Sequence, residues 1–246
     1  MVAFTGAAGS VDAATVLRLV SAALQDLEPG QESRWPWEGG ADSVGLLDFL
    51  NAAVRDVALY RPDLCAVTEP IRLEPGMTQR LPRRGVHEAS RDALFLMELV
   101  RNMGADGARP GAGITFAPRE LLLAWQGLGR WCGGVESYCY DRAVNPDAYY
   151  VYPAVPERGD VWVEATYAAP LPELLSPEQP LPLPGEYAPA LAHHVLASVL
   201  SGDNESASLA RGTYHRQLFE SLMGVRAKVD AAWPRTRNPM TEAGHG

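Results

Sequence analysis

The sequence predicts an α+β fold, with one helical layer built from both ends of the chain and a central antiparallel β-sheet or sandwich. Two observations predict this fold. Apolar residues near both ends recur at three- and four-residue steps, which is typical of amphipathic helices. Between these regions, Gly and Pro separate short segments rich in aromatic and β-branched residues, which is typical of strands.

The N-terminal part, residues 1–62, is predicted to hold two helices at about residues 11–27 and 43–60. The second helix has one apolar stripe that can face a core, formed by Leu47, Leu50, Val54, Val57 and Ala58. Pro62 lacks an N–H and keeps Arg61 out of the helical conformation, so this helix is expected to end there. Two helices with such a connection commonly pack antiparallel.

The central part, residues 63–170, carries the strand signals. Strands are predicted at residues 67–73, 77–81, 95–100, 137–141, 149–152 and 161–167. The segment 95–100 also suits a helix, whereas the last strand alternates apolar and polar residues cleanly. The run from Glu74 to Met77 has Pro and Gly at type II turn positions, which predicts a hairpin between the first two strands. Residues 118–126 are predicted to form a short helix with Pro in its first turn.

A proline-rich connector, residues 171–184, follows the strands and is expected to be extended and stiff. It is either a spacer or a strap laid across a neighbouring subunit, since a proline strap loses little entropy on docking. Residues 185–234 are predicted to form two helices. Their apolar stripes are Leu191, Val195, Leu196 and Val199, and then Leu218, Leu222, Val225, Val229 and Trp233. Asp203 and Asn204 can cap the second helix, and the tail, residues 235–246, is polar.

Composition limits the classes of protein that this chain can belong to. With 246 residues, of which 47% are hydrophobic, the chain is long enough to bury a real core. No apolar run reaches the roughly 18–20 residues needed to cross a bilayer, so no membrane partner is expected. The three cysteines cannot all pair, which fits a reducing cytosol. A formal net charge of −9 argues against tight, non-specific binding of duplex DNA.

We find no catalytic, metal-binding or cofactor-binding motif in the sequence, so the chain is not predicted to be an enzyme. Neighbouring residues on a helix point about 100° apart, so His193 and His194 are not expected to bind one metal ion together. One of them is expected to face the core and the other the solvent. Cys132 and Cys139 lack the spacing of a zinc site, and buried structural cysteine is commoner than a catalytic thiol.

Seven short segments occur in a fixed order along the chain. They are residues 34–37 (RWPW), 47–51 (LDFLN), 59–63 (LYRPD), 100–104 (VRNMG), 145–146 (NP), 150–153 (YVYP) and 181–191 (LPLPGEYAPAL). The ordered set resembles a family of tailed-bacteriophage adaptors, which are virion proteins that join the capsid portal to the tail. The resemblance spans roughly residues 17–233. Residues 38–43 look like an insertion and residues 85–92 like a lengthened loop, and both can alter partner contacts.

The resemblance implies a ring, of twelve copies, under the portal in the neck of the virion, assembled in the host cytoplasm. Its partners would be other copies of the chain, the portal protein and a tail or nozzle protein. Genomic DNA would pass through the channel without sequence-specific binding, and no cofactor is implied. If part of the net charge of −9 per copy lines the lumen, we expect the wall to repel DNA and let it slide.

The candidate contact residues are Trp37, Arg34, Arg61, Arg101, Arg235, Arg237 and Pro239. Trp and Arg are enriched at the energetic centres of protein interfaces. Trp37 either covers the end of the helix pair or anchors an interface. Arg34, Arg61 and Arg101 either pair with carboxylates of their own chain or clamp a neighbouring subunit. The tail from Arg235 is the candidate portal-binding arm.

Two other interpretations remain open. One is a small cytoplasmic enzyme or ligand-binding protein that uses the β region, which a deep pocket with a Cys–His pair would favour. The other is a different virion part, such as a tail-completion or baseplate protein, which six-fold symmetry would favour over twelve-fold.

Overall fold

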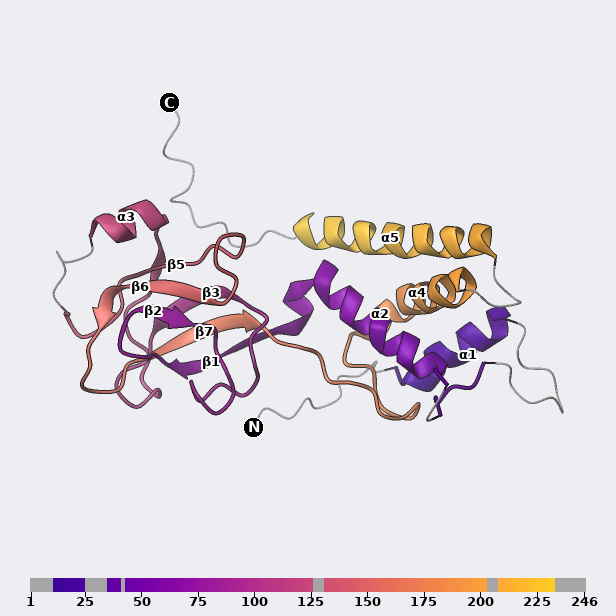
Figure 1. Cartoon of the computed structure of the whole chain (residues 1–246), viewed down its shortest axis with the longest axis horizontal. Coiled ribbons are helices and arrows are strands. Elements are labelled where there is room, and N and C mark those ends of the chain that lie inside the picture. Colours follow the sequence, from indigo (N-terminus) through magenta and orange to yellow (C-terminus); the bar gives the residue numbers. More distant parts are fainter. Residues whose placement is uncertain (1–10, 25–34, 41–42, 126–130, 203–207, 233–246) are drawn as a thin grey trace, which may run out of the picture. The chain divides into compact units, whose positions relative to one another are not determined.

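The computed structural model describes residues 11–24, 35–40, 43–125, 131–202 and 208–232, with side chains as far as residue 224. The chain divides into two compact units (Figure 1). The helical unit comprises Met1–Arg61 and Leu171–Gly246, and the β unit comprises Pro62–Pro170. The α+β class, with helices from both ends of the chain packed together and strands between them in sequence, is confirmed.

The helical unit is built around one buried helix. Its helices are α1 (Ala13–Leu24), α2 (Leu46–Tyr60), α4 (Ala188–Ser201) and α5 (Leu209–Ala232). Helix α4 packs against each of the other three (Figure 1). Ten of its 14 residues are buried, and four of the ten are alanines, whose small side chains let neighbouring helices approach closely. The expectation of a single apolar stripe on each helix is therefore wrong for α4, which is buried on nearly all sides.

Helix α2 shows how local sequence sets the helix ends. At its C-terminus the N–H of Arg61 still donates to the Val57 carbonyl at 2.8 Å, and Pro62 then begins a short 3₁₀ turn, Pro62–Cys65. The predicted stop at Pro62 is confirmed. The helix begins at Leu46, three residues later than predicted, where the Asp48 carboxylate accepts a hydrogen bond from the Gly45 N–H at 2.8 Å. A carboxylate in the first turn is also favoured by the helix dipole.

The proline-rich connector is packed against its own helical unit. The side chain of Asn51 in α2 both donates to the Leu174 carbonyl and accepts from the Leu174 N–H, each at 2.9 Å. The Leu181 N–H donates to the Val11 carbonyl just before α1 at 2.9 Å. Leu174, Leu181 and Leu183 are all buried. The connector is therefore an ordered part of the helical unit, and these three apolar side chains are already covered by it.

The α5 helix faces the rest of its unit with a stripe other than the predicted one. Phe219 and Met223 are fully buried, whereas Leu218 and Leu222 are only half-buried. The predicted stripe is therefore displaced by one position. Helix α5 contacts α4 very closely at Gly212, where an added Cβ would lie 2.3 Å from the Ser201 hydroxyl. The predicted Val225 and Val229 lie where side chains are not described, and Asp203, Asn204 and Trp233 lie outside the described residues.

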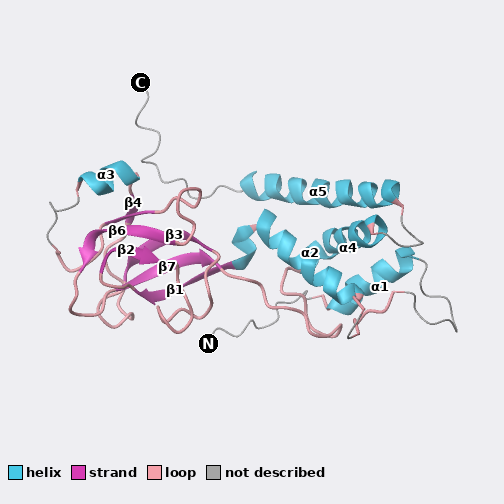
Figure 2. Ribbon diagram, viewed as in Figure 1, coloured by secondary structure: helices cyan, strands magenta, loops and turns pink. Residues whose placement is uncertain are grey.

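The β unit contains two sheets (Figure 2). The strands are β1 (Ala66–Arg72), β2 (Gly76–Arg80), β3 (Phe95–Asn102), β4 (Thr115–Phe116), β5 (Ser137–Cys139), β6 (Ala148–Val155) and β7 (Trp162–Ala168). The first sheet has the antiparallel order β1-β7-β3. The second has the order β2-β6-β5-β4, in which only β4 and β5 run parallel. Residues from both sheets share one core, as expected for a sandwich.

The predicted hairpin between the first two strands is wrong. Strand β1 pairs with β7 and β2 pairs with β6, so the chain passes from one sheet to the other at the predicted turn. Gly76 has the positive φ, +110°, that a type II turn needs at that position. The buried side chain of Gln79 then accepts from the Glu74 N–H at 2.8 Å and donates to the carbonyls of Glu74 and Gly76. These backbone groups are therefore satisfied by a side chain instead of a facing strand.

The other strands lie where the sequence predicts them, with the exception of β4. The ambiguous segment at 95–100 is a strand, because it lies within β3, and the clean alternation of β7 is confirmed. Val163, Ala165 and Tyr167 are fully buried on one face of β7. The predicted short helix is α3 (Arg119–Ala124), which begins directly after Pro118. Strand β4 was not predicted, because two residues are too few to carry a periodic pattern.

Candidate contact surfaces

Four of the predicted contact residues, Arg34, Arg235, Arg237 and Pro239, lie outside the described residues. The proposed portal-binding arm from residue 235 onward therefore remains a prediction. The other three, Trp37, Arg61 and Arg101, are described, and each has a partner within its own unit.

Trp37 belongs to a loop that packs on the start of α2. Its indole N–H donates to the hydroxyl of the buried Ser21 in α1 at 2.9 Å, and its carbonyl accepts from the Leu47 N–H at 2.9 Å. Gly45 allows the loop to come this close, because a Cβ there would lie 2.4 Å from the Gly39 nitrogen. Trp37 thus covers the end of the helix pair. The indole is only half-buried, so its second role, as an interface anchor, stays a prediction.

The two described arginines both make structural contacts. Arg61 is 8% exposed, and its guanidinium donates to the hydroxyl of the buried Tyr187 at 2.9 Å. This geometry favours a role in holding the end of α2 to the segment that precedes α4. Arg101 on β3 lies directly opposite Glu164 on β7, with 2.9 Å between the Arg101 Nε and a Glu164 carboxylate oxygen. A further role of either arginine at a subunit interface stays a prediction.

The β unit exposes large apolar side chains that are not among the predicted contact residues. Phe116 on β4 is 60% exposed, and Leu121 and Leu123 on α3 are also exposed. The Phe116 ring packs edge-on against Tyr138, with 5.6 Å between the ring centroids. The run Leu121-Leu122-Leu123 is the sequence feature that could have indicated this exposure. Three consecutive residues of a helix cannot all face one side, and α3 buries only Leu122.

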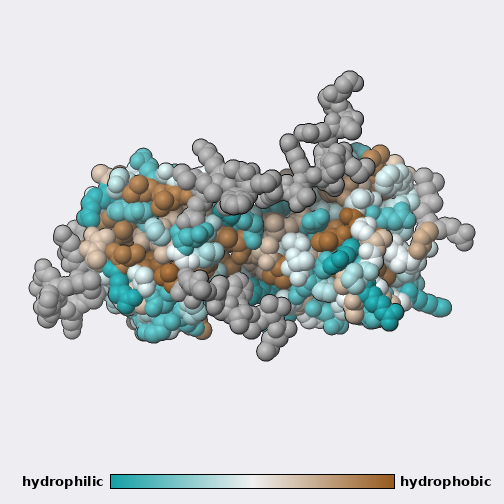
Figure 3. All heavy atoms as spheres, turned by 180° about the vertical axis from the view of Figure 1, so that it is seen from behind, coloured by the Kyte–Doolittle hydropathy of each residue, from teal (hydrophilic) through white to brown (hydrophobic). Residues whose placement is uncertain are grey.

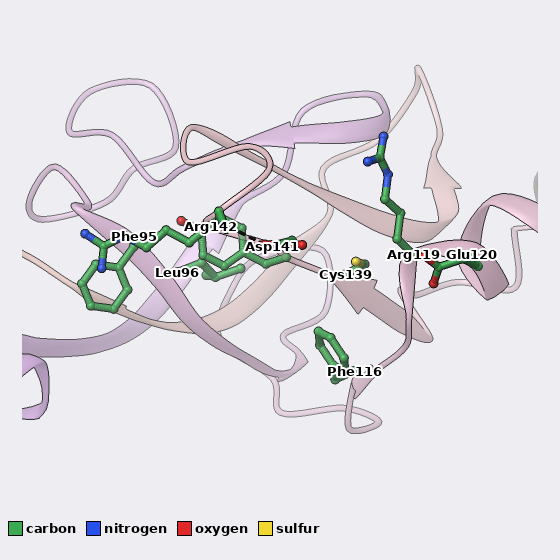
Figure 4. Close-up of a pocket in the computed structure, with 10 residues that line it drawn as sticks. Phe95, Leu96, Phe116, Arg119, Glu120, Cys139, Asp141 and Arg142 are labelled. Atoms are coloured by element: carbon green, nitrogen blue, oxygen red, sulfur yellow. Dashed lines mark hydrogen bonds between the residues drawn. The ribbon is translucent and has the colours of Figure 1, made fainter.

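An open hollow of about 500 Å³ lies beside Phe116 (Figure 4). At one end the Arg142 guanidinium lies 4.2 Å from the centroid of the Phe95 ring, a cation–π contact. Arg119 extends away from Phe116, with its guanidinium 5.6 Å from the Tyr150 ring centroid. Both arginines are thus already engaged with aromatic rings. The hollow is therefore a shallow, mixed apolar and charged surface.

One cysteine lies in this hollow, and its surroundings do not activate the thiol. Cys139 lies in its wall, and burial raises the pKa of the Cys139 thiol above its ordinary value, with the nearby Asp141 carboxylate adding to the effect. The thiol is therefore neutral at pH 7 and a poor nucleophile. No histidine lines the hollow among the residues that the structure describes. The Cys–His pair that would favour an enzyme is not found here.

The helical unit also exposes large apolar side chains at the end of α2 and on α5. Leu59, Tyr60 and Tyr214 are each more than half exposed. Tyr60 packs edge-on against the buried Phe219 of α5, so its ring is held in place while its outer part remains exposed. Figure 3 shows apolar residues gathered in patches between hydrophilic ones on the face that it draws. Preorganised aromatic side chains of this kind are common at protein interfaces.

Histidines join the helices of this unit. Of the two adjacent histidines, one was expected to face the core and the other the solvent, and only the first half of this prediction holds. His194 is buried, and its Nε2 lies 2.6 Å from the Asp56 carboxylate of α2. His193 is half-buried and does not simply face solvent, because its Nδ1 lies 3.0 Å from the Nδ1 of His215 in α5. Among the described residues, no cluster of three or more His, Cys, Asp or Glu side chains is arranged to hold a metal ion.

Within the described ranges, no helix combines the length and the apolar character needed to cross a membrane. No curated protein matches the chain. The family model described as SU10 adaptor protein matches residues 12–241, which is nearly the whole sequence. The chain therefore belongs to the SU10 adaptor protein family, a family of phage head-to-tail adaptors whose role is structural rather than catalytic.

Proposed function

We propose that the chain is a subunit of a twelve-copy ring in the virion neck that joins the portal to the tail and encloses part of the DNA channel. The observation that carries this proposal is the family match over residues 12–241, which includes both the helical unit and the β unit.

Ring closure requires two different surfaces on every copy. In a head-to-tail arrangement one surface of each subunit binds a different surface of the next, and the ring closes when the rotation divides a full turn. Two exposed apolar surfaces are available, one around Phe116 in the β unit and one around Leu59 and Tyr60 in the helical unit. We expect contacts with neighbouring copies, the portal protein or a tail or nozzle protein to use them, together with the arm that begins at Arg235.

The acidic character of the chain supports a passive role toward DNA. Each copy carries a formal charge of −9, so acidic side chains on a lumen would repel the phosphate backbone and prevent sticking. Replacing lumen-facing acidic residues with Arg is expected to slow genome ejection. Unchanged ejection kinetics would contradict this part of the proposal.

Electron microscopy of the purified chain, with and without portal, tests the central proposal. We expect twelve-fold rings bound to the portal, with a continuous channel. Six-fold particles would favour a tail-completion or baseplate role, and a monomer that turns over a small molecule would favour an enzyme. Deleting residues 235–246 is expected to leave a folded protein that no longer binds portal, and unimpaired binding would reject the arm.

A further inference from the structure

The histidine pair between α4 and α5 has a geometry suited to more than a hydrogen bond. The Nδ1 atoms of His193 and His215 lie 3.0 Å apart, and the two rings are inclined by 27°. In the metal-free protein one ring must donate its Nδ1–H to the lone pair of the other, since both atoms cannot be acceptors. Replacing that shared proton with a cation would place two imidazole lone pairs on one ion.

We propose that His193 and His215 form a two-imidazole binding site for a divalent transition-metal ion such as Zn²⁺ or Ni²⁺, linking α4 to α5. A zinc ion lies about 2.0–2.1 Å from an imidazole nitrogen. An ion equidistant from two nitrogens 3.0 Å apart therefore has an N–metal–N angle of about 94°. That angle lies between the square and the tetrahedral values, and each ring would turn so that its Nδ1 lone pair points at the ion instead of at the other ring.

The surroundings allow an ion to enter. Both side chains are half-buried, so the site is sheltered but open to solvent. Burial lowers the pKa of each ring, which leaves both imidazoles neutral at pH 7, the form that binds metals. The nearby positive charge of Arg211 opposes binding, and the Asp56 carboxylate already contacts His194.

The proposed site is an open one. Because the described residues supply no third ligand, water would fill the remaining positions, and binding is expected to be weaker than at a closed four-ligand site. The ion would bind only where α4 and α5 are packed together. It would therefore stabilise the folded chain in proportion to its free concentration. The proposal does not depend on the ring or on any phage partner.

Thermal unfolding of the full chain with added metal tests this site. We expect Zn²⁺ and Ni²⁺ to raise Tm in a concentration-dependent, EDTA-reversible way, while Mg²⁺, which prefers oxygen ligands, has no effect. The shift should be lost in both His193→Gln and His215→Gln. It should persist in a control chain carrying Cys132→Ser and His245→Gln, which removes an exposed thiol and a histidine of the tail.

Electron paramagnetic resonance of wild-type chain with one equivalent of Cu²⁺ provides a readout that needs no variant. The expected spectrum shows coupling to two imidazole nitrogens. A missing Tm shift in the wild-type chain, an equal shift in the histidine variants, or a Cu²⁺ spectrum without two-nitrogen coupling would each overturn the proposal.

Discussion

Asn51 is the residue whose replacement should affect the helical unit most directly, because it holds the proline-rich connector to α2. In Asn51→Ala both 2.9 Å hydrogen bonds to the Leu174 backbone are lost, and the Leu174 N–H and carbonyl are left buried without that partner. Each such bond contributes about 1 kcal/mol net, and an unpaired buried group costs about 1–3 kcal/mol. We therefore expect a loss of about 2–4 kcal/mol in the free energy of unfolding.

Urea denaturation followed by circular dichroism measures this loss, and limited proteolysis reports whether the connector opens first. A loss of about 2.8 kcal/mol raises the opened fraction roughly 100-fold, so cleavage between residues 171 and 184 should accelerate strongly if opening is local. Asn145→Ala is a matched control, because its side chain makes only a 3.3 Å contact with the Asp147 N–H in a surface loop. A loss below about 0.5 kcal/mol for Asn51→Ala, or one equal to the control, would refute the reasoning.

Three further predictions follow from single contacts. Phe219→Ala, at a fully buried ring, should cost about 3–5 kcal/mol in urea denaturation, and a cost below 1 kcal/mol would show that α5 is not held there. Arg101→Ala should cost only about 0–1 kcal/mol, because its ion pair with Glu164 is partly exposed, and a double-mutant cycle measures this coupling. Burial lowers the pKa of His193 and His215 below the unfolded value of about 6.5, so the unfolded chain binds more protons. Stability should therefore be complete above that pH and fall below it, and a double His→Gln variant should show a shallower fall in pH-dependent denaturation.

Local signals in the sequence predicted those parts of the fold that depend on neighbouring residues. Pro62 ends α2 because it cannot donate a hydrogen bond, whatever surrounds it. Strand β7 buries alternate residues because a strand has a two-residue period and one face meets the core. Both features depend on residues that are close together in the chain, so a single sequence is enough to predict them.

Two kinds of contact could not be predicted from the sequence: a side chain that takes the place of a strand partner, and the close approach of two helices. Gln79 replaces a facing strand at the turn after β1, and nothing in its neighbours indicates that its side chain folds back on Glu74 and Gly76. Sequence periodicity likewise does not indicate the close approach of Gly212 in α5 to Ser201 in α4.

The same distinction applies to the contact residues. Residue type favours Trp37, Arg61 and Arg101 as interface residues, yet each has a partner in its own unit. Large side chains with hydrogen-bonding groups are equally useful for joining segments within one chain and for joining two chains. Only the exposure of a side chain in the folded unit distinguishes a residue that joins two chains from one that joins segments of a single chain. By this criterion, mutagenesis of the adaptor should target Phe116 and Tyr60. Their rings pack against Tyr138 and Phe219, while their outer parts remain exposed.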